Sequence, residues 1–176
     1  MRRNRELING ATYYITCNIN RFKSELIEEE IKELLFKTLE ETKKRFEFDL
    51  NQFVVVDDHA HFIIKPDAKN KDKYSLSKIM QWLLGTFAVR YNKKTKQKGK
   101  VWYDRYKSEI IEVAEKVKKT TKDVVNQVVK ASYKLKSFII RILDNLSRFG
   151  IKNPNEYRYC GIIHINNKNP LITPVL

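Results

Sequence analysis

Residues 50–65, LNQFVVVDDHAHFIIK, contain two apolar runs separated by two aspartates. The first run, up to Asp57, is rich in β-branched side chains and predicts a buried strand. Asp57 and Asp58 suit a tight turn. The second run, residues 59–65, predicts a strand that returns antiparallel to the first. A hairpin of this kind is the starting point for the whole fold.

Two helices and two further strands are expected around this hairpin. Residues 11–19 predict a strand, and residues 101–113 predict a turn followed by a strand. One helix is expected from a cap at Ser24 to about residue 46, and another from a cap at Ser75 to about residue 92. Their apolar stripes are Ile27, Ile31, Leu34, Leu35 and Leu39 in the first helix, and Leu76, Ile79, Met80, Leu83 and Phe87 in the second.

The order of these elements is β-α-β-β-α-β, which is typical of the ferredoxin-like, split βαβ arrangement. The expected class is therefore α+β. It has an antiparallel sheet with both helices on one face, and the other face is left free for a ligand. Residues 1–113 would form this core.

A helical extension is expected after the core, within residues 114–150. Residues 115–149 read as helix, either continuous or with one break. Apolar residues recur in steps of four and three, which suits packing on the core or on a second subunit. They are Val124, Val128, Ala131, Leu135, Phe138 and Ile142. Residues 151–176 read as an irregular tail with one short strand at 161–165.

The composition favours a polyanionic partner. The chain of 176 residues has 35 Lys and Arg against 21 Asp and Glu, a net charge of +14. Nucleic acid is the leading partner, a membrane surface is the second, and a merely solvated basic surface is the alternative to both. No apolar run suits a membrane span or a signal peptide, so a cytoplasmic location without membrane association is expected. Cys17 and Cys160 then read as reduced thiols.

His59 and His61 are the residues that most clearly suggest chemistry. Residues i and i+2 of a strand point to the same face, so both imidazoles could bind one divalent ion. Ala60, Phe62 and Ile64 would point into the core. Imidazole suits Zn, Mn, Co or Ni, and tolerates Mg when oxygen ligands complete the shell. Two unrelated surface histidines are the alternative.

Five segments, taken together and in order, resemble the single-tyrosine HUH transposases, in particular the REP-associated branch of the insertion-sequence-200-like family. The similarity covers about residues 2–113 and 139–161. The segments are RRNRELINGATYYIT (2–16), VVVDDHAHFIIKP (54–66), SLSKIMQWLLGTFAVRYNKK (75–94), GKVWYDRYKSEII (99–111) and ILDNLSRFGIKNPNEYRYCG (142–161).

The resemblance implies a DNA transposase that binds hairpin DNA with single-stranded flanks. It implies a divalent ion, Mg or Mn, held by His59 and His61 together with an amide side chain that follows the catalytic tyrosine by four residues. It implies cleavage and rejoining through a 5′-phosphotyrosine intermediate, and a homodimer.

The chain departs from this pattern at the nucleophile. The alignment places Asn145 at the amide position as the third ligand, but places Arg141 where the family has its tyrosine, and Leu146 where it has a proline. Tyr133 is the only tyrosine in the long helical region and is the candidate nucleophile. An ordinary packed or surface tyrosine is the alternative at that position.

Basic and aromatic residues suit contacts with DNA. Cations would bind phosphates, and aromatic rings would stack on unpaired bases. Arg2 and Arg5 would belong to an N-terminal arm, and Trp102 is equally compatible with a core position. The candidates are Arg3, Lys93, Lys94, Lys96, Lys98, Lys100, Arg105, Lys107 and Arg141 as cations, and Trp102, Tyr103 and Tyr106 as stacking groups.

Three functions remain open from the sequence. The first is an active transposase. The second is a decayed or domesticated descendant that binds structured single-stranded DNA without cutting it, which the arginine at position 141 suggests. The third and weakest is an RNA-binding ferredoxin-like domain, because such a sheet is a common RNA platform.

Overall fold

The hairpin at the centre of the sequence forms as predicted in the computed structural model of the chain. β2 (Phe48–Val55) and β3 (His59–Pro66) pair antiparallel. The turn is closed by the Val56 N–H, which donates to the carbonyl of His59 (3.0 Å). The structure describes residues 7–8, 10–20, 26, 28–67, 75–112 and 121–173, without the side chains of residues 112 and 121–132.

The sheet has the predicted ferredoxin-like topology. β1 (Thr12–Asn18) and β4 (Lys107–Glu112) complete it in the order β2-β3-β1-β4, with every neighbour antiparallel. β3 lies between β1 and β2, which is the split βαβ unit that the element order predicted. The α+β class is confirmed.

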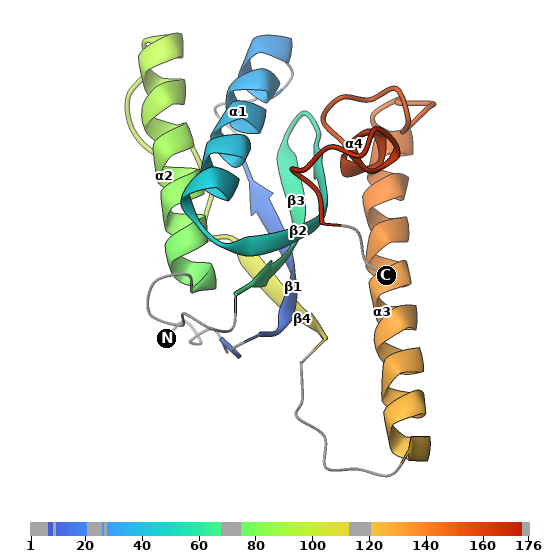
Figure 1. Cartoon of the computed structure of the whole chain (residues 1–176). Helices are drawn as coiled ribbons and strands as arrows, with labels where there is room; N and C mark the ends of the chain where they lie inside the picture. Colours follow the sequence, from blue (N-terminus) through green and yellow to red (C-terminus); the bar gives the residue numbers. More distant parts are fainter. Residues whose placement is uncertain are drawn as a thin grey trace.

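α1 (Glu29–Arg45) and α2 (Leu76–Thr95) cover one face of the sheet (Figure 1). Ala60, Phe62 and Ile64 point into the core beneath them, as predicted. The predicted Ser75 cap is present, since its side chain accepts from the Lys78 N–H (3.4 Å).

The predicted ends of both helices need correction. α1 begins at Glu29 rather than near Ser24, which lies outside the described residues. α2 runs past residue 92 to Thr95 and ends where Lys96 adopts a left-handed conformation (φ 54°).

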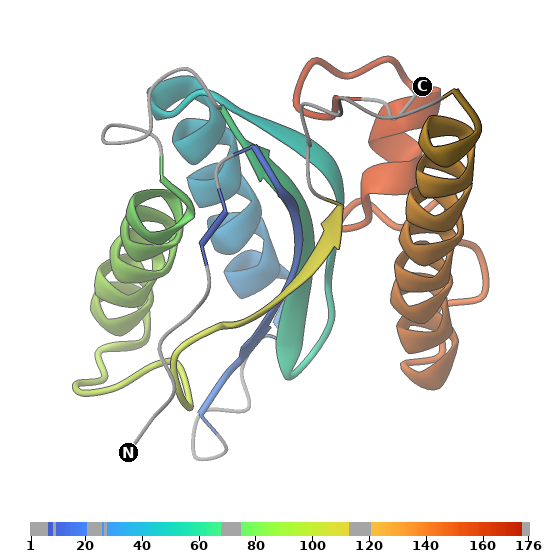
Figure 2. The same cartoon turned by 90° about the horizontal axis from the view of Figure 1, so that it is seen from below.

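The opposite face of the sheet is not free, contrary to the prediction. α3 (Thr121–Arg148) lies across it, as the view from below shows (Figure 2). Phe138, Ile142 and Leu146 of α3 are buried against this face. The reason is that the face is itself apolar where β1, β2 and β3 meet, at Tyr14, Val54 and Ile63, and must be covered.

α3 is continuous over its described length, so the optional break does not occur within residues 121–148. Of the predicted seam, Phe138 and Ile142 pack inside the chain and Leu135 is half-buried. The side chains of Val124, Val128 and Ala131 lie outside the description.

The segment predicted as a short strand at 161–165 is a helix, α4 (Gly161–Asn166). Its isoleucines favour a strand, but its buried positions, Gly161 and His164, are three residues apart, as on a helix face. The chain on either side of α4 covers the outer edge of β2. There the Val55 N–H donates to the Tyr159 carbonyl (2.9 Å), and the Thr173 N–H donates to the Leu50 carbonyl (2.8 Å).

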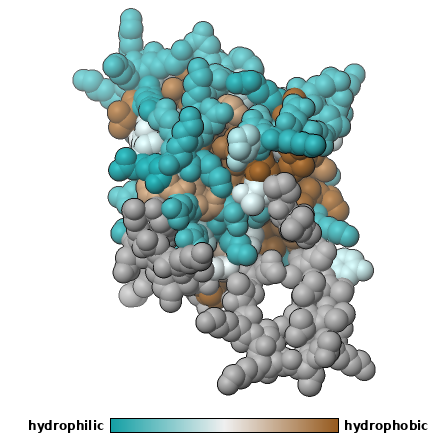
Figure 3. Space-filling view, viewed as in Figure 1, coloured by the Kyte–Doolittle hydropathy of each residue, from teal (hydrophilic) through white to brown (hydrophobic). Residues whose placement is uncertain are grey.

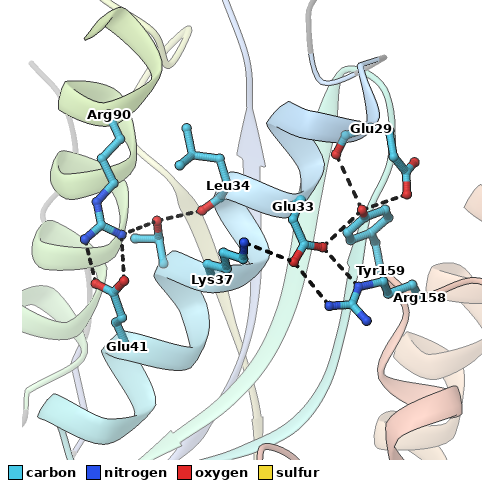
Figure 4. A network of polar contacts seen from close by, with 9 residues as sticks. Glu29, Glu33, Leu34, Lys37, Glu41, Arg90, Arg158 and Tyr159 are labelled. Carbon is cyan, nitrogen blue, oxygen red and sulfur yellow. Dashed lines mark hydrogen bonds and ion pairs between the residues drawn. The ribbon is translucent and has the colours of Figure 1, made fainter. Parts of the chain in front are cut away.

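Ion pairs connect α1 to α2 and to the C-terminal segment (Figure 4). Arg90 of α2 makes a two-pronged contact with Glu41 (3.0 and 2.6 Å). Arg158 does the same with Glu33 (3.0 and 3.2 Å). The Tyr159 hydroxyl donates to Glu29 (2.7 Å). The C-terminal segment is thus tied to the core.

Hydrophilic side chains cover most of the described surface in Figure 3, and hydrophobic ones gather on the side where α3 and α4 lie. No described helix is both long enough and apolar enough to cross a bilayer.

Gly161→Ala is expected to destabilise the chain by about 1–3 kcal/mol, the usual range for overpacking. A Cβ at this position would lie 1.9 Å from Oε1 of Gln52, which is 2% exposed and accepts from the Phe53 N–H. Urea unfolding measures the change. Gly85→Ala is the matched control, because nothing lies within 4 Å of a Cβ added at this position. It should stabilise α2 by about 0.5–1 kcal/mol. Equal stability of Gly161→Ala and wild type would contradict the close packing of Gly161 against Gln52.

Candidate functional site

His59 and His61 lie side by side on β3, on the face that α3 covers. Their ring centroids are 4.6 Å apart and the rings are nearly perpendicular (73°). His61 is 6% exposed, and the His59 side chain is 14% exposed. The alternation of β3 thus brings the two predicted residues together next to a covering helix.

His61 is held by β1. Its Nδ1 lies 3.0 Å from Oγ1 of Thr16, and its ring stacks on Tyr14 with 5.1 Å between the centroids. Burial, followed by the proximity of His59, lowers the pKa of His61 well below its ordinary value, to about 3. The imidazole is therefore neutral at physiological pH, which is the form that binds metal ions.

His59 is held by the turn and by the end of α3. Its Nδ1 lies 2.5 Å from Oδ1 of Asp58. A carboxylate partner on one ring nitrogen fixes the ring orientation and leaves the other nitrogen for a ligand, as in many metal sites. The ring of Phe149, just beyond α3, lies 5.8 Å from the His59 ring.

One face of α3 spans the histidine pair. Arg141 and Asn145 are four residues apart and lie on the same face of α3, and Phe149 continues this spacing one residue past the helix end. The guanidinium of Arg141 lies 5.1 Å from the Tyr14 ring that stacks on His61. Since Phe149 contacts His59, Asn145 lies on the helix between these two contacts. Its amide nitrogen donates to the Arg141 carbonyl (2.9 Å).

The two histidines are too few to hold a metal ion by themselves. Within the described residues, no third His, Cys, Asp or Glu joins the two histidines in a group that could hold a metal ion. A third protein ligand would have to be of another type, and an amide oxygen on the covering helix is suitable for Mg or Mn. The residues present thus fit a divalent ion that keeps open positions for water or phosphate.

Arg141 adds a fixed positive charge beside the histidines. Its guanidinium also lies over the Phe138 ring (5.2 Å) and 3.8 Å from Glu109 of β4. The side chain is 55% exposed, and Arg stays charged at any relevant pH. This residue can therefore contact an anion that reaches the pair from solvent.

Tyr133 is not brought to the histidines. It precedes Arg141 by eight residues, which is about 12 Å along the helix axis. Its side chain is 69% exposed.

The predicted DNA-contacting residues fall into two groups. Lys107 stands opposite Thr16 in the sheet, and Thr16 stands opposite His61. Because opposed residues of antiparallel strands share a face, Lys107 belongs to the histidine face. The loop after α2 reaches the same end of the sheet as His59, since the Tyr103 N–H donates to the carbonyl of Asn18, the partner of His59 (2.9 Å). The exposed cations of this loop are Lys96, Lys98, Lys100 and Arg105, and Lys93 and Lys94 are exposed in the last turn of α2.

Trp102 lies in the core, which was the alternative left open by the sequence. It is 8% exposed, and its indole N–H donates to the Leu84 carbonyl (3.0 Å). Tyr106 is equally buried, whereas Tyr103 is 54% exposed. Lys94 pairs with Glu30 of α1. Arg3 lies outside the described residues.

Sequence reasoning missed the residues that surround the pair. The predicted topology already placed their strands near β3. Tyr14 and Thr16 lie on β1, next to β3, and Glu109 lies on β4, one strand further. Their alternation along β1 and β4 was a usable signal. The contact of Phe149 with His59 carried no sequence signal, because it depends on how α3 crosses the sheet.

Comparisons with known proteins bear on the family and the fold of the chain. The family described as transposase IS200 like matches residues 10–128. A solved structure of a REP-associated tyrosine transposase bound to a REP hairpin superposes with a TM-score of 0.66 at 19% identity. The match covers 98% of this chain and 88% of that one. A candidate transposase from Deinococcus radiodurans R1 gives a TM-score of 0.45 at 15% identity, covering 74% of this chain and 96% of that one. No curated protein matches.

Proposed function

Because the chain belongs to the IS200-like transposase family, we propose that it binds hairpin DNA with single-stranded flanks across its histidine face and cleaves and rejoins the strand there. The observation that carries the proposal is the histidine pair beneath one face of α3, with a cation beside it. In this proposal residues 1–113 form the catalytic core, 114–150 supply the covering helix, and 151–176 buttress the edge of the sheet.

His59, His61 and Asn145 are the proposed ligands of a divalent ion, Mg or Mn. Such an ion, when bound, withdraws charge from a scissile phosphate as a Lewis acid. Both imidazoles suit metal binding, because His61 is neutral and buried and His59 is oriented by Asp58. α3 excludes water from one side of the pair.

Tyr133 is the proposed nucleophile. Its oxygen would bond to the phosphorus while the bond to the 3′ oxygen breaks, which gives a 5′-phosphotyrosine and a free 3′-OH that takes the phenolic proton. The phenol is exposed but lies two turns from the part of α3 that covers its own histidines. We therefore propose a homodimer in which Tyr133 of one copy serves the histidines of the other.

A second candidate function is binding of structured single-stranded DNA without cleavage. The observation that favours it is Arg141, which occupies the place beside Tyr14 and His61 from which the family's tyrosine would act. A guanidinium binds phosphate but cannot attack it. In this case the histidine face would serve as a phosphate-binding surface.

Covalent capture distinguishes the two functions. Purified chain is incubated with a labelled hairpin oligonucleotide and Mn, and the products are separated on a denaturing gel. An adduct that disappears in Tyr133→Phe supports cleavage through Tyr133. Binding in a mobility-shift assay without any adduct supports the second function. Absence of DNA binding, at low salt and with Mn, would contradict both.

The basic residues are expected to make DNA binding depend on salt. The logarithm of the affinity should fall with the logarithm of the salt concentration. Replacing both Lys100 and Lys107 by alanine should make this fall shallower, by about 0.7 in slope for each phosphate that is no longer neutralised. Fluorescence anisotropy at several salt concentrations measures this slope. Lys37→Ala is the control, because Lys37 is exposed on α1, beyond the other face of the sheet. An unchanged slope in the double variant would place the DNA elsewhere.

A further inference from the structure

Thr16 of β1 is the direct cross-strand neighbour of His61. Its Oγ1 lies 3.0 Å from Nδ1 of the imidazole. Since opposed residues in antiparallel strands share a face, this contact is set by the sheet register and not by a mobile loop. It therefore belongs to the rigid part of the fold.

Tyr14 holds the same imidazole in a second way, because its ring stacks on the ring that Thr16 contacts. Tyr14 is 2% exposed. β1 therefore supplies two partners of the ring, Thr16 at Nδ1 and Tyr14 stacked against it.

These partners determine which ring nitrogen carries the proton. A neutral imidazole has one N–H donor and one lone pair. The Thr16 hydroxyl lies at Nδ1 and can accept a hydrogen bond from it. With the proton on Nδ1, the lone pair lies on Nε2, which is then the nitrogen that can bind an ion.

The third histidine shows the contrasting case. His164 has both ring nitrogens in contact with protein, Nε2 with the Arg158 carbonyl (2.9 Å) and Nδ1 with Asn169 (3.1 Å). Its ring packs against Phe36 (5.1 Å). This arrangement leaves no nitrogen for a ligand, and His164 is a structural residue. For His61, the hydrogen bond to Thr16 is at Nδ1.

We infer that Thr16, together with the stacked Tyr14 ring, is a positioning residue that keeps His61 in the Nδ1–H tautomer and directs Nε2 toward the bound metal ion. The inference deepens the proposed function and rests on it for the identity of the ligand. Hydrogen-bonded partners behind metal-binding histidines commonly have this role.

The tautomer is measured on the metal-free protein by long-range ¹H–¹⁵N NMR of the histidine rings. The wild type is expected to show the Nδ1–H pattern for His61. Thr16→Val, which keeps the shape and the strand preference of the residue, should lose this pattern, and Thr16→Ser should restore it. Thr12→Val is the matched control, because Thr12 is a buried threonine on the same face of β1. An Nε2–H pattern in the wild type, or an unchanged pattern in Thr16→Val, overturns the inference.

Titration with Mn alone provides the second readout. Thr16→Val should bind Mn about 10–100-fold more weakly, with Thr16→Ser close to wild type. Wild-type affinity in Thr16→Val would overturn the positioning role. Failure of the wild type to bind Mn would instead contradict the proposed metal site, and the NMR pattern would still decide the tautomer. The two failures are thus distinguishable.

Discussion

Arg141→Tyr is expected to form a covalent adduct with hairpin DNA in the presence of Mn, in larger amount than the wild type. The substitution puts a phenol at the position that the sequence resemblance assigns to the family's tyrosine, where Arg141 lies next to the Tyr14 ring that stacks on His61. A tyrosine at position 141 could attack a phosphate at the histidines of its own chain, without a second copy of the protein. Correct placement of a reacting group is worth on the order of 100-fold in rate or more.

Two controls define this result. Arg141→Phe has the same ring without the hydroxyl and should form no adduct at position 141. Arg141→Tyr combined with Tyr133→Phe should keep the adduct, which peptide mapping would place on residue 141. If Arg141→Tyr binds Mn and DNA as the wild type does and yet forms no adduct, the placement of the scissile phosphate over the histidine pair is wrong.

His61→Ala is expected to abolish cleavage and to weaken Mn binding by about 100-fold or more, because loss of a ligand should exceed the 10–100-fold effect of losing a partner behind one. Isothermal titration with Mn measures the affinity. Circular dichroism should show a retained fold, since the ring contributes only one side of a larger apolar cluster around Tyr14 and Phe138.

His164→Gln is the matched control for this prediction. His164 is also buried, but it packs against Phe36 and Phe53 on the side of α1. Its loss should lower stability without changing the affinity for Mn. Cleavage that persists in His61→Ala would contradict the assignment of the metal site.

The sequence predicted the core of the fold because the signals there are local. The two aspartates of the turn and the alternation around Ala60 and Phe62 identify the hairpin, and Ser75 marks the start of α2. Family membership, expected from five short segments, is confirmed by the match over residues 10–128.

The errors concern contacts between distant segments. The second face of the sheet was expected to be free because an alternating pattern indicates one core face, whereas Tyr14 and Ile63 are buried on the other face as well. Residues 161–165 were expected to contain a short strand, and they form the helix α4. Gly161 approaches Gln52 closely there, which is a contact between distant segments that no local pattern reveals.

The candidate site was predicted in part. The histidine pair follows from a two-residue spacing on a strand, and the structure places both rings together. The position of Arg141 beside them depends on how α3 crosses the sheet, and the role of Thr16 depends on strand register. Metal binding, the Asn145 ligand and the Tyr133 nucleophile remain proposals.

The central claim is that this chain joins covalently to the DNA it binds. The most direct test is incubation of the wild type with labelled hairpin DNA and Mn, followed by peptide mapping of any adduct that survives denaturation. The account predicts an adduct on Tyr133 that requires both histidines. DNA bound at the histidine face with no adduct on any tyrosine would contradict it and would establish the chain as a DNA-binding member of its family.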